Sequence, residues 1–149
     1  MALMGVAELE RFFRSVAGID VDKDDLKRFD DFVNDKIYDL LIRGVANAKA
    51  NNRDVVQPSD LPITKGLQES IHAFRKIDAE VSLAAILDQL TRWPPLDLVY
   101  DDEVKSRLPE IAGGLGVALG KTFVIIDPEV KNPSTAHWER AFQIFNLLL

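Results

Sequence analysis

The chain has 149 residues, of which 47% are hydrophobic, and it contains no cysteine. This length and composition predict about one domain with a sizeable core rather than a disordered segment, and the missing thiols exclude disulfides and thiolate metal sites. The 18 basic and 24 acidic residues give a net charge of −6, which disfavours a partner bound mainly through phosphate charge, although a local basic patch would still allow one.

The first half of the chain predicts a short helix, a long helix and a third helix, in that order. Apolar residues recur at helical spacing in residues 6–17, and Gly18 is expected to end this first helix. A long amphipathic helix is expected over residues 24–51, where acidic side chains at its start would cap free N–H groups. The third helix is expected to start near residues 59–60, with Pro62 in its first turn.

The second half predicts the same order of helices. A short helix is expected over residues 82–92, a long one from about residue 101 to Ile126, and a last one from about Ser134 onward. Pro109 lies inside the second long helix, where a proline removes a backbone hydrogen bond. The helix is therefore expected either to bend at Pro109 or to restart there after a short turn.

The two halves also echo one another in sequence. Residues 19–27, IDVDKDDLK, are matched weakly by residues 96–105, LDLVYDDEVK. Each half gives a short helix, a strand-like loop, a long helix, a second strand-like loop and a short helix, which indicates an internal duplication. We place the boundary after Asp78, so that residues 1–78 and 79–149 form the two halves of one compact domain.

The order of elements in each half resembles the histone fold. Residues 46–60, ANAKANNRDVVQPSD, resemble the end of the long histone helix, its second loop and the start of the last helix. Archaeal histones carry in this loop an arginine that clamps an aspartate seven residues later, and Arg53 and Asp60 have that spacing. The whole chain resembles the bacterial double-histone-fold family, whose function is uncharacterised. The resemblance implies an all-α fold in which two tandem histone folds form an intramolecular, histone-like pseudo-dimer.

The same resemblance implies how the two halves meet. A single histone unit leaves the apolar stripe of its long helix uncovered, so histones pair head to tail, and two units in one chain would cover each other's stripes. The first loop of each half should then form a short parallel bridge with the second loop of the other half. Residues 19–21 are expected beside residues 128–132, and residues 96–99 beside residues 54–56.

The stretch GGLGVALGKT, residues 113–122, imitates a phosphate-binding loop without its spacing or context. The motif needs a glycine five residues before Gly-Lys-Thr, where this chain has leucine, and it needs a strand before it and a helix after it. In a helix, Gly113, Gly116 and Gly120 would instead form a stripe of small residues. We expect this stripe to let another helix approach closely, most simply the first long helix near Gly44.

The remaining candidate sites for ligands or catalysis are weak. Aspartates within residues 20–31 imitate a calcium-binding loop, but the sixth position lacks the glycine and the twelfth is Asp instead of Glu, so helix capping explains them more simply. His72 and His137 have no second histidine or thiolate at ligand spacing, and no serine–histidine–acid group stands out. We expect no metal, no cofactor, no small-molecule substrate and no enzymatic activity.

The resemblance to histones suggests DNA binding as a function, but the loops that would contact the DNA are acidic. Histones hold duplex DNA through their paired loops and the starts of their first helices, whereas Asp20, Asp22 and Asp54 occupy the matching loops here. A carboxylate repels a phosphate by about 1 kcal/mol at 4 Å even in water. Nucleosome-style wrapping by this edge is therefore disfavoured.

Two functions follow as hypotheses. The first is a non-enzymatic protein-association module, for example by self-assembly through the ends of the long helices and the third helices. The second is a nucleoid-associated DNA-binding protein that uses another, salt-sensitive face, with Arg43, Lys49, Arg75 and Lys76 as candidate contacts. Because acidic residues come early and no apolar run approaches about 18 residues, we expect a cytoplasmic protein that does not enter a membrane.

Overall fold

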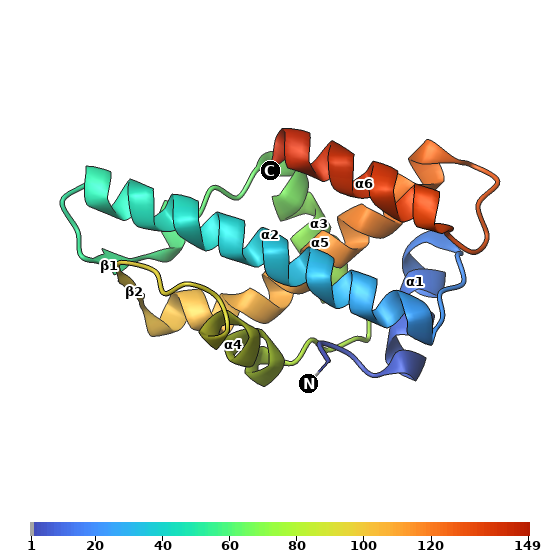
Figure 1. Ribbon diagram of the computed structural model, residues 1–149, viewed down its shortest axis with the longest axis horizontal. Helices are drawn as coiled ribbons and strands as arrows, with labels where there is room; N and C mark the ends of the chain where they lie inside the picture. Colours follow the sequence, from blue (N-terminus) through green and yellow to red (C-terminus); the bar gives the residue numbers. More distant parts are fainter. Residues whose placement is uncertain (1) are drawn as a thin grey trace.

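Six α-helices and one two-stranded sheet make up residues 2–149, the part of the chain that the computed structural model describes (Figure 1). The chain is mostly helical, as predicted. The helices are α1 (Val6–Ala17), α2 (Lys23–Ala50), α3 (Lys65–Arg75), α4 (Leu83–Thr91), α5 (Asp102–Ile126) and α6 (Thr135–Leu148). The short strands are β1 (Val55–Val56) and β2 (Val99–Tyr100), and a single 3-10 turn, η1 (Pro58–Asp60), follows β1.

The caps of the first two helices are the residues that the sequence predicted. Gly18 ends α1 in the left-handed backbone conformation, with φ at 64°, and its N–H bonds back to the last turn. The carboxylate of Asp22 accepts the N–H of Asp24 at 2.9 Å, while Asp25 accepts the N–H of Asp22 at 3.1 Å. These reciprocal bonds satisfy N–H groups that have no partner inside the helix, so α2 begins directly after Asp22.

The predicted start of the third helix is wrong. Helix α3 begins at Lys65, after η1 and an extended linker. Leu61 is extended, with φ at −71° and ψ at 129°, because it precedes Pro62, and a proline ring disfavours helical backbone at the residue before it. Thr64 caps the helix instead, since its hydroxyl oxygen accepts a backbone N–H of the first turn at 3.1 Å.

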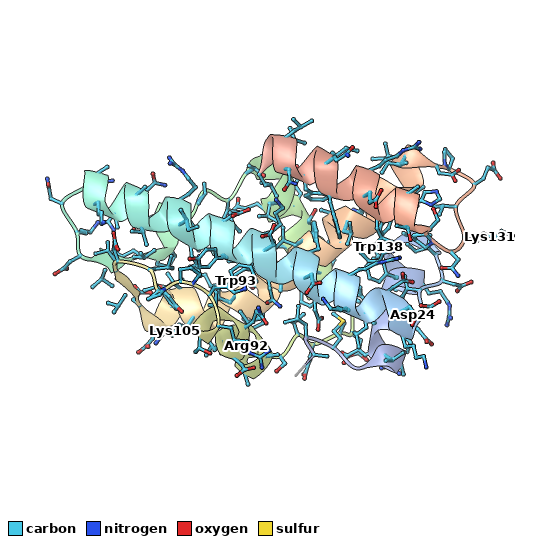
Figure 2. The ribbon with its side chains drawn as sticks, in the orientation of Figure 1. Asp24, Arg92, Trp93, Lys105, Lys131 and Trp138 are labelled. Carbon is cyan, nitrogen blue, oxygen red and sulfur yellow. The ribbon has the colours of Figure 1, made fainter. Side chains whose placement is uncertain are left out.

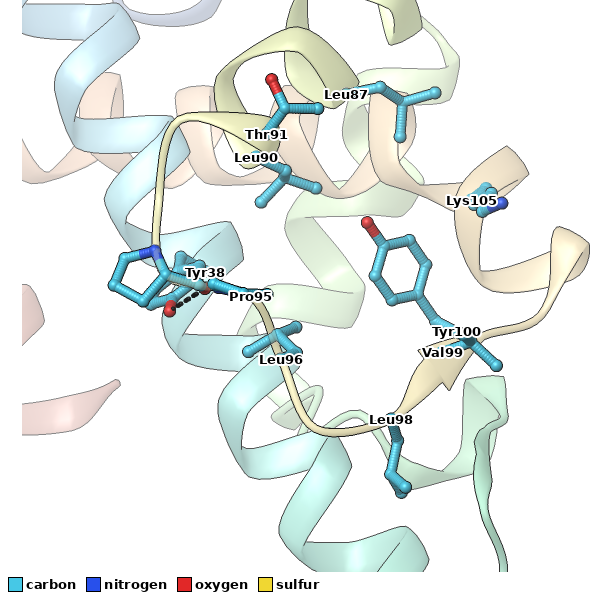
Figure 3. A pocket seen from close by; sticks show the side chains of 11 residues that line it. Tyr38, Leu87, Leu90, Thr91, Pro95, Leu96, Leu98, Val99, Tyr100 and Lys105 are labelled. Carbon is cyan, nitrogen blue, oxygen red and sulfur yellow. Dashed lines mark hydrogen bonds between the residues drawn. The ribbon is translucent and has the colours of Figure 1, made fainter.

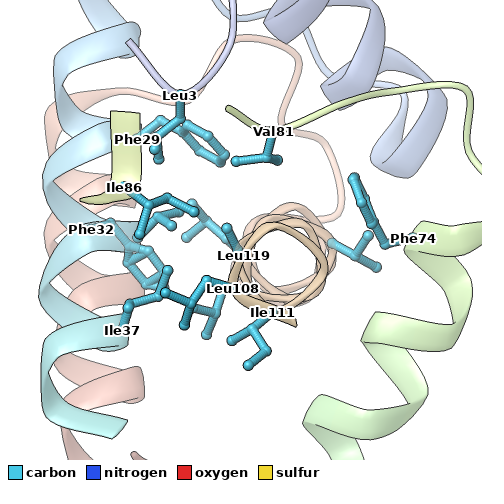
Figure 4. Packing of buried hydrophobic residues seen from close by; sticks show 14 of the residues in the cluster. Leu3, Phe29, Phe32, Ile37, Phe74, Val81, Ile86, Leu108, Ile111 and Leu119 are labelled. Atoms are coloured by element: carbon cyan, nitrogen blue, oxygen red, sulfur yellow. The ribbon is translucent and has the colours of Figure 1, made fainter. Parts of the chain in front are cut away.

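Helix α5 is continuous and central. It runs through Pro109 without interruption, so the alternative in which the helix restarts at Pro109 is wrong. By length and composition it could cross a membrane, with a mean hydropathy of 1.4, but 56% of that stretch is buried inside the protein. Its apolar residues are those of a core helix: Figure 4 looks along α5 and shows apolar side chains of α2, α3 and α4 gathered around it.

The two long helices, α2 and α5, cross at the centre of the molecule, and each is covered by a short helix from the other half of the sequence (Figure 1). Helix α3 packs against α5. Helix α6 lies along α2, where the rings of Phe142 and Phe32 stack with their centroids 5.4 Å apart. The apolar stripes of both long helices are thereby buried in one shared core.

Both predicted contacts between loops of opposite halves are confirmed, but within residues 2–149 only the one between β1 and β2 forms a strand pair. Strands β1 and β2 pair in parallel, with Val55 opposite Val99. At the other end of the molecule, the N–H of Asp20 donates to the carbonyl oxygen of Lys131 at 2.6 Å. The first loop of each half therefore lies against the second loop of the other.

Glycines of α5 allow close contact with two short helices. A Cβ atom added at Gly113 would overlap the ring of Phe74 in α3. One added at Gly116 would press against the ring of Phe12 in α1, and one at Gly120 would also meet side chains of α1. These positions need glycine because the aromatic rings occupy the space that a larger residue would fill.

The expected partner of this glycine stripe, Gly44 of α2, is wrong. Gly44 lies under β1 and the linker, where an added Cβ would meet Leu61 and Val56 at 3.0 and 3.1 Å. Helix α2 approaches Gly116 with the large ring of Phe29 instead, which would lie 3.1 Å from the added atom. The crossing of the long helices is thus a contact between a ring and a glycine, not between two glycines.

Candidate functional site

The Arg53 guanidinium and the Asp60 carboxylate form a two-pronged ion pair in the loop that contains β1 and η1. Arg53 Nη2 donates to Asp60 Oδ1 at 2.6 Å, and Nη1 donates to Oδ2. The N–H of Gln57 also donates to Oδ2, at 2.8 Å. These bonds hold the pKa of the buried Asp60 carboxyl below its ordinary value, the Arg53 bond being the main cause. The pair fixes the loop between α2 and α3 and is not open to a ligand.

The two loop bridges carry acidic side chains at both ends of the molecule. Beside the β1–β2 bridge, Asp97 binds the ammonium of Lys49 at 2.6 Å, and Asp101 is occupied in capping α5. At the other bridge, Asp20 lies 3.5 Å from the guanidinium of Arg14. Lys49 and Arg14 are thus already paired with carboxylates, whereas Lys131 at the second bridge is exposed and has no ion pair within residues 2–149.

The four candidate DNA contacts lie on two elements, with Arg43 and Lys49 on α2 and Arg75 and Lys76 at the end of α3, and two of the four are already paired. Arg75 binds Glu110 of α5 with two hydrogen bonds of 3.0 Å, and Lys49 binds Asp97. Within residues 2–149, Arg43 and Lys76 have no ion-pair partner, but Arg43 lies on α2 and Lys76 follows the end of α3. A DNA-binding face would therefore have to break existing ion pairs or rely on two cations from separate helices.

A groove lined mainly by apolar side chains lies between α3, α5 and α6. Its volume is about 470 Å³, and its lining includes Leu67, Ala118 and Phe145. Three exposed apolar side chains line it, with exposed fractions of 79% for Ile125, 37% for Ile144 and 75% for Leu148, and Leu147, which precedes Leu148 in α6, is 85% exposed. We call the groove and these four residues the apolar face. Exposed apolar surface that gathers in one place marks an interaction site, whereas scattered apolar residues do not.

Charge is nearly absent from the apolar face. Among the residues that line the groove, Lys121 is the one charged side chain and none is a carboxylate. The sequence of α6 after Arg140 contains no charged residue. The acidic side chain that α3 carries near this face, Glu69, is held by Lys65 at 2.8 Å. Depletion of charge at the centre of a surface is typical of protein interfaces.

Buried polar side chains attach α6 to α2. Trp138, which lies between α6 and α2 in Figure 2, donates from its indole Nε1 to Asp25 Oδ1 at 3.1 Å. Burial raises the pKa of the Asp25 carboxyl. Further along, the buried Lys36 ammonium binds the amide oxygen of Asn146 and lies 3.5 Å from Asp39. Sequence reasoning assigned Asp25 to helix capping alone and missed both links, because they join residues far apart in the chain.

Ser134, His137 and Asp127 form a hydrogen-bonded chain that sequence reasoning also missed. Asp127 Oδ2 lies 3.0 Å from His137 Nε2, while His137 Nδ1 accepts the N–H of Ser134 at 2.9 Å. The Ser134 hydroxyl, 2.8 Å from Nδ1, also accepts the N–H of His137. The three residues thus form a capping box at the start of α6, extended by a bond to the end of α5. Within residues 2–149, no group of three or more His, Asp or Glu side chains could hold a metal ion.

Solved structures place this fold among histone-like proteins. A protein of Thermus thermophilus matches with a TM-score of 0.94 at 52% identity, over 99% of each chain. A protein of Aquifex aeolicus matches with a TM-score of 0.82 at 25% identity, over 99% of this chain and 97% of that one. The histone of Methanopyrus kandleri matches with a TM-score of 0.61 at 14% identity, over 93% of this chain and 92% of the histone. The last match shows a histone-like fold and no more than that.

Sequence comparison finds relatives of uncharacterised function. Two uncharacterised proteins of Aquifex aeolicus strain VF5 are similar: one is 29% identical over 111 residues and the other 31% identical over 125 residues. These matches cover 74% and 75% of this chain; they span just under two thirds of the first relative (65%) and 72% of the second. A family model described as a domain of unknown function, DUF1931, matches residues 9–146. The chain therefore belongs to the DUF1931 family.

Proposed function

We propose that this protein is an intramolecular histone-like pseudo-dimer, with residues 1–78 and 79–149 as its two histone-fold halves. Three features support the proposal: the repeated order of helices, the exchange of short helices between the two long ones, and the bridges between loops of opposite halves. Each half covers the apolar stripe of the other, so the chain needs no partner to complete its core. A partner would bind at the surface that this arrangement leaves exposed.

The function that we propose is non-enzymatic protein association, in which the chain pairs with a second copy through the apolar face. The observation that carries this proposal is that Ile125, Ile144 and Leu148 are exposed and line a charge-depleted groove. Fully burying a leucine or isoleucine side chain stabilises a complex by roughly 1.5–3 kcal/mol. Three such residues are a substantial driving force for association, although part of it is offset by lost translational and rotational freedom.

The charge distribution allows a second copy to bind at the apolar face. Each chain carries a net charge of −6, so two copies repel one another at most orientations. Within residues 2–149, no aspartate or glutamate side chain lines the groove of the apolar face, which carries Lys121 instead, so two such chains can meet there with less repulsion than at the rest of their surface. In a two-fold interface the same patch lies on both copies and must be complementary to itself. The apolar face meets this requirement, because it has a groove and also exposed leucines that can enter the groove of the other copy.

The test is the mass in solution, measured by size-exclusion chromatography with light scattering. We expect wild-type protein to reach twice the chain mass of 16.7 kDa as its concentration rises. The double substitution Ile125→Glu with Leu148→Glu should leave a folded monomer, because both residues line the groove and the change places two carboxylates from each copy at the interface. The matched control is Val99→Glu, since Val99 is an apolar residue with 68% exposure outside the apolar face. A wild type that stays monomeric, or a control that dissociates as fully as the double variant, would contradict the proposal.

The alternative, a nucleoid-associated DNA-binding protein, is less well supported by the charge distribution. Lys49 and Arg75 would have to leave Asp97 and Glu110 before they could bind phosphates. Fluorescence anisotropy with duplex DNA, from about 20 to 200 mM salt, separates the two functions, because binding through basic side chains weakens steeply with salt. Binding that depends on Arg43 and Lys76 would favour DNA. We propose a cytoplasmic location for the protein in either case.

A further inference from the structure

A second cavity lies outside the apolar face, where α4 and the following loop meet the start of α5. Its volume is about 310 Å³, at the lower end of the range for ligand pockets. Four of its eleven lining residues are leucines, namely Leu87, Leu90, Leu96 and Leu98, and Figure 3 shows Leu87, Leu90 and Leu96 around an open space beside Tyr100. Tyr38 closes one side and is fixed there, because its hydroxyl donates to the carbonyl oxygen of Pro94 at 2.7 Å.

In the first half of the chain, buried side chains occupy the region that corresponds to this cavity. Ile19 and Val21, which match Leu96 and Leu98 in the sequence echo, are buried, with 0% and 5% exposure. The short helix that precedes them carries the fully buried ring of Phe13. When α1 and α4 are aligned on their buried residues Leu9 and Ile86, Leu90 takes the place of Phe13.

This difference leaves Leu96 and Leu98 half-exposed to the cavity. An aromatic ring fills a place that a leucine leaves partly empty, and the resulting space is open to solvent and to a ligand. A ring-sized or branched apolar group is therefore the occupant that the walls of the cavity fit best.

Two polar side chains point to the rest of the ligand. The hydroxyl of Tyr100 projects into the cavity among the leucines (Figure 3). The Lys105 ammonium lies at the rim, 5.7 Å from the centre of the Tyr100 ring. Among residues 2–149, no aspartate or glutamate lines the cavity, so its one charged side chain is positive even though the chain is acidic. Burial raises the pKa of the Tyr100 phenol, which keeps the hydroxyl protonated as a hydrogen-bond donor.

We propose that this cavity binds a small amphipathic anion, namely a carboxylate that carries an aromatic ring or a short branched chain. The apolar group lies among the leucines, where the first half of the chain has its own phenylalanine. The carboxylate accepts a hydrogen bond from the Tyr100 hydroxyl and pairs with the Lys105 ammonium. A charge-assisted hydrogen bond of this kind gives both orientation and preference for an anion. The site is independent of the apolar face and therefore does not rest on self-association.

The experiment is a two-dimensional NMR titration of ¹⁵N-labelled protein with 3-phenylpropanoate and with its uncharged amide. We expect shift changes confined to Tyr38 and residues 87–105, and at least about tenfold weaker binding of the amide, which lacks the charge that Lys105 recognises. Lys105→Met should weaken the carboxylate about tenfold and leave the amide unchanged, because it keeps the length of the side chain and removes its charge. Tyr100→Phe should weaken both probes, since it removes one donor and keeps the ring.

Two further variants serve as controls. Lys27→Met removes the lysine that matches Lys105 in the first half, where buried side chains take the place of the cavity, and it should bind like wild type. Leu90→Phe places in α4 the ring that α1 carries at Phe13; it should fill the cavity, abolish binding and raise the melting temperature. Absence of carboxylate binding at millimolar concentration would overturn the proposal. So would equal affinity for the acid and the amide, or shifts centred on the apolar face. If Leu90→Phe instead changes only the binding of a protein, the cavity holds a partner's side chain and the proposal is wrong.

Discussion

The side chain of Asp60 is buried because partners satisfy both of its oxygens. Arg53 binds each oxygen, and the N–H of Gln57 binds one of them. The carbonyl oxygen of Asp60 also accepts the side-chain amide of Asn47, which ties the turn to α2 at 2.7 Å. A charge in this position is stabilising only while its partner remains, because an unpaired buried carboxylate has lost its water.

Arg53→Ala is therefore expected to lower the stability at neutral pH, because it leaves the buried Asp60 carboxylate without its partner. Such an unpaired carboxylate costs about 2–4 kcal/mol of unfolding free energy. Lys27→Ala, which breaks an exposed pair with Asp31, should have a much smaller effect, since exposed ion pairs contribute little. Urea unfolding of both variants measures the difference. Equal losses in the two variants would mean that the clamp is only a surface ion pair.

The pH dependence of the clamp follows from the lowered pKa of Asp60. A carboxyl with a lowered pKa in the folded state contributes stability above its ordinary value of 3.8, and this contribution is lost as the pH falls through the folded pKa. The gap between wild type and Arg53→Ala should therefore shrink when unfolding is repeated below about pH 3.8. A gap that stays constant down to about pH 2 would contradict this account.

Asp30 has the opposite effect on stability. Burial raises its pKa from 3.8 to about 6. A carboxyl with a raised pKa holds its proton more tightly when folded, so its stabilising contribution is lost as the pH rises through about 6. Asp30→Asn, which keeps an acceptor for the N–H of Leu3 but cannot ionise, should be more stable than wild type by about 1–2 kcal/mol at about pH 7.5. The two should be equal near about pH 4. Thermal unfolding of wild type and Asp30→Asn at the two pH values measures the difference in stability. A variant less stable than wild type at the higher pH would refute the prediction.

At the scale of single elements, the fold of α5 depends on glycines that are poor helix formers. Gly113→Ala would gain about 1 kcal/mol of helix propensity, but its Cβ would overlap the ring of Phe74. Overpacking of a core costs about 1–3 kcal/mol, so a net loss of stability is expected. Gly66→Ala is the matched control, because Gly66 also lies in a helix and an added Cβ there meets nothing within 4 Å. It should stabilise the protein by up to about 1 kcal/mol. Chemical denaturation measures the unfolding free energy of both variants. A Gly113→Ala variant more stable than wild type would show that α3 does not pack against α5 as closely as described.

Helix positions could be predicted from the sequence wherever a local signal sets them. Gly18, Asp22 and Ser134 act through bonds within their own turn, so their roles as caps are visible in the chain alone. The start of α3 was missed although Pro62 carries the signal, because a proline fits the first turn of a helix as well as a linker before one. Only the rest of the fold decides between these two positions.

Contacts between distant elements were predicted less well. The resemblance to histones predicted both contacts between loops of opposite halves. The contact of the glycine stripe with Gly44 was predicted from residue spacing alone and is wrong. Neither the apolar face nor the cavity beside Tyr100 has a motif, since each combines residues from three or more segments. Exposure of Leu147 and Leu148 also cannot be read from periodicity, because a leucine at helical spacing predicts burial by default.

At the scale of the whole molecule, the proposed pseudo-dimer completes its core within one chain, whereas a histone needs a second chain to do so. In the proposed arrangement, pairing of the halves completes the core inside one chain, and the apolar face is the surface proposed for contact with a second copy. The acidic net charge and the ion pairs of Lys49 and Arg75 reduce the surface available to DNA. An acidic molecule with one charge-depleted apolar face suits association with proteins better than association with phosphates.

The most direct test of this account is the distance between two copies of α6, measured by pulsed electron resonance with a spin label. The chain contains no cysteine, so Gln143→Cys, an exposed position on α6, and Thr91→Cys on α4 each give one labelling site. Helices α4 and α6 lie on opposite sides of α2 (Figure 1). The account predicts one short intermolecular distance for labels at position 143 and a longer one, or none, at position 91. No intermolecular signal at position 143, or a shorter distance at position 91, would contradict association through the apolar face.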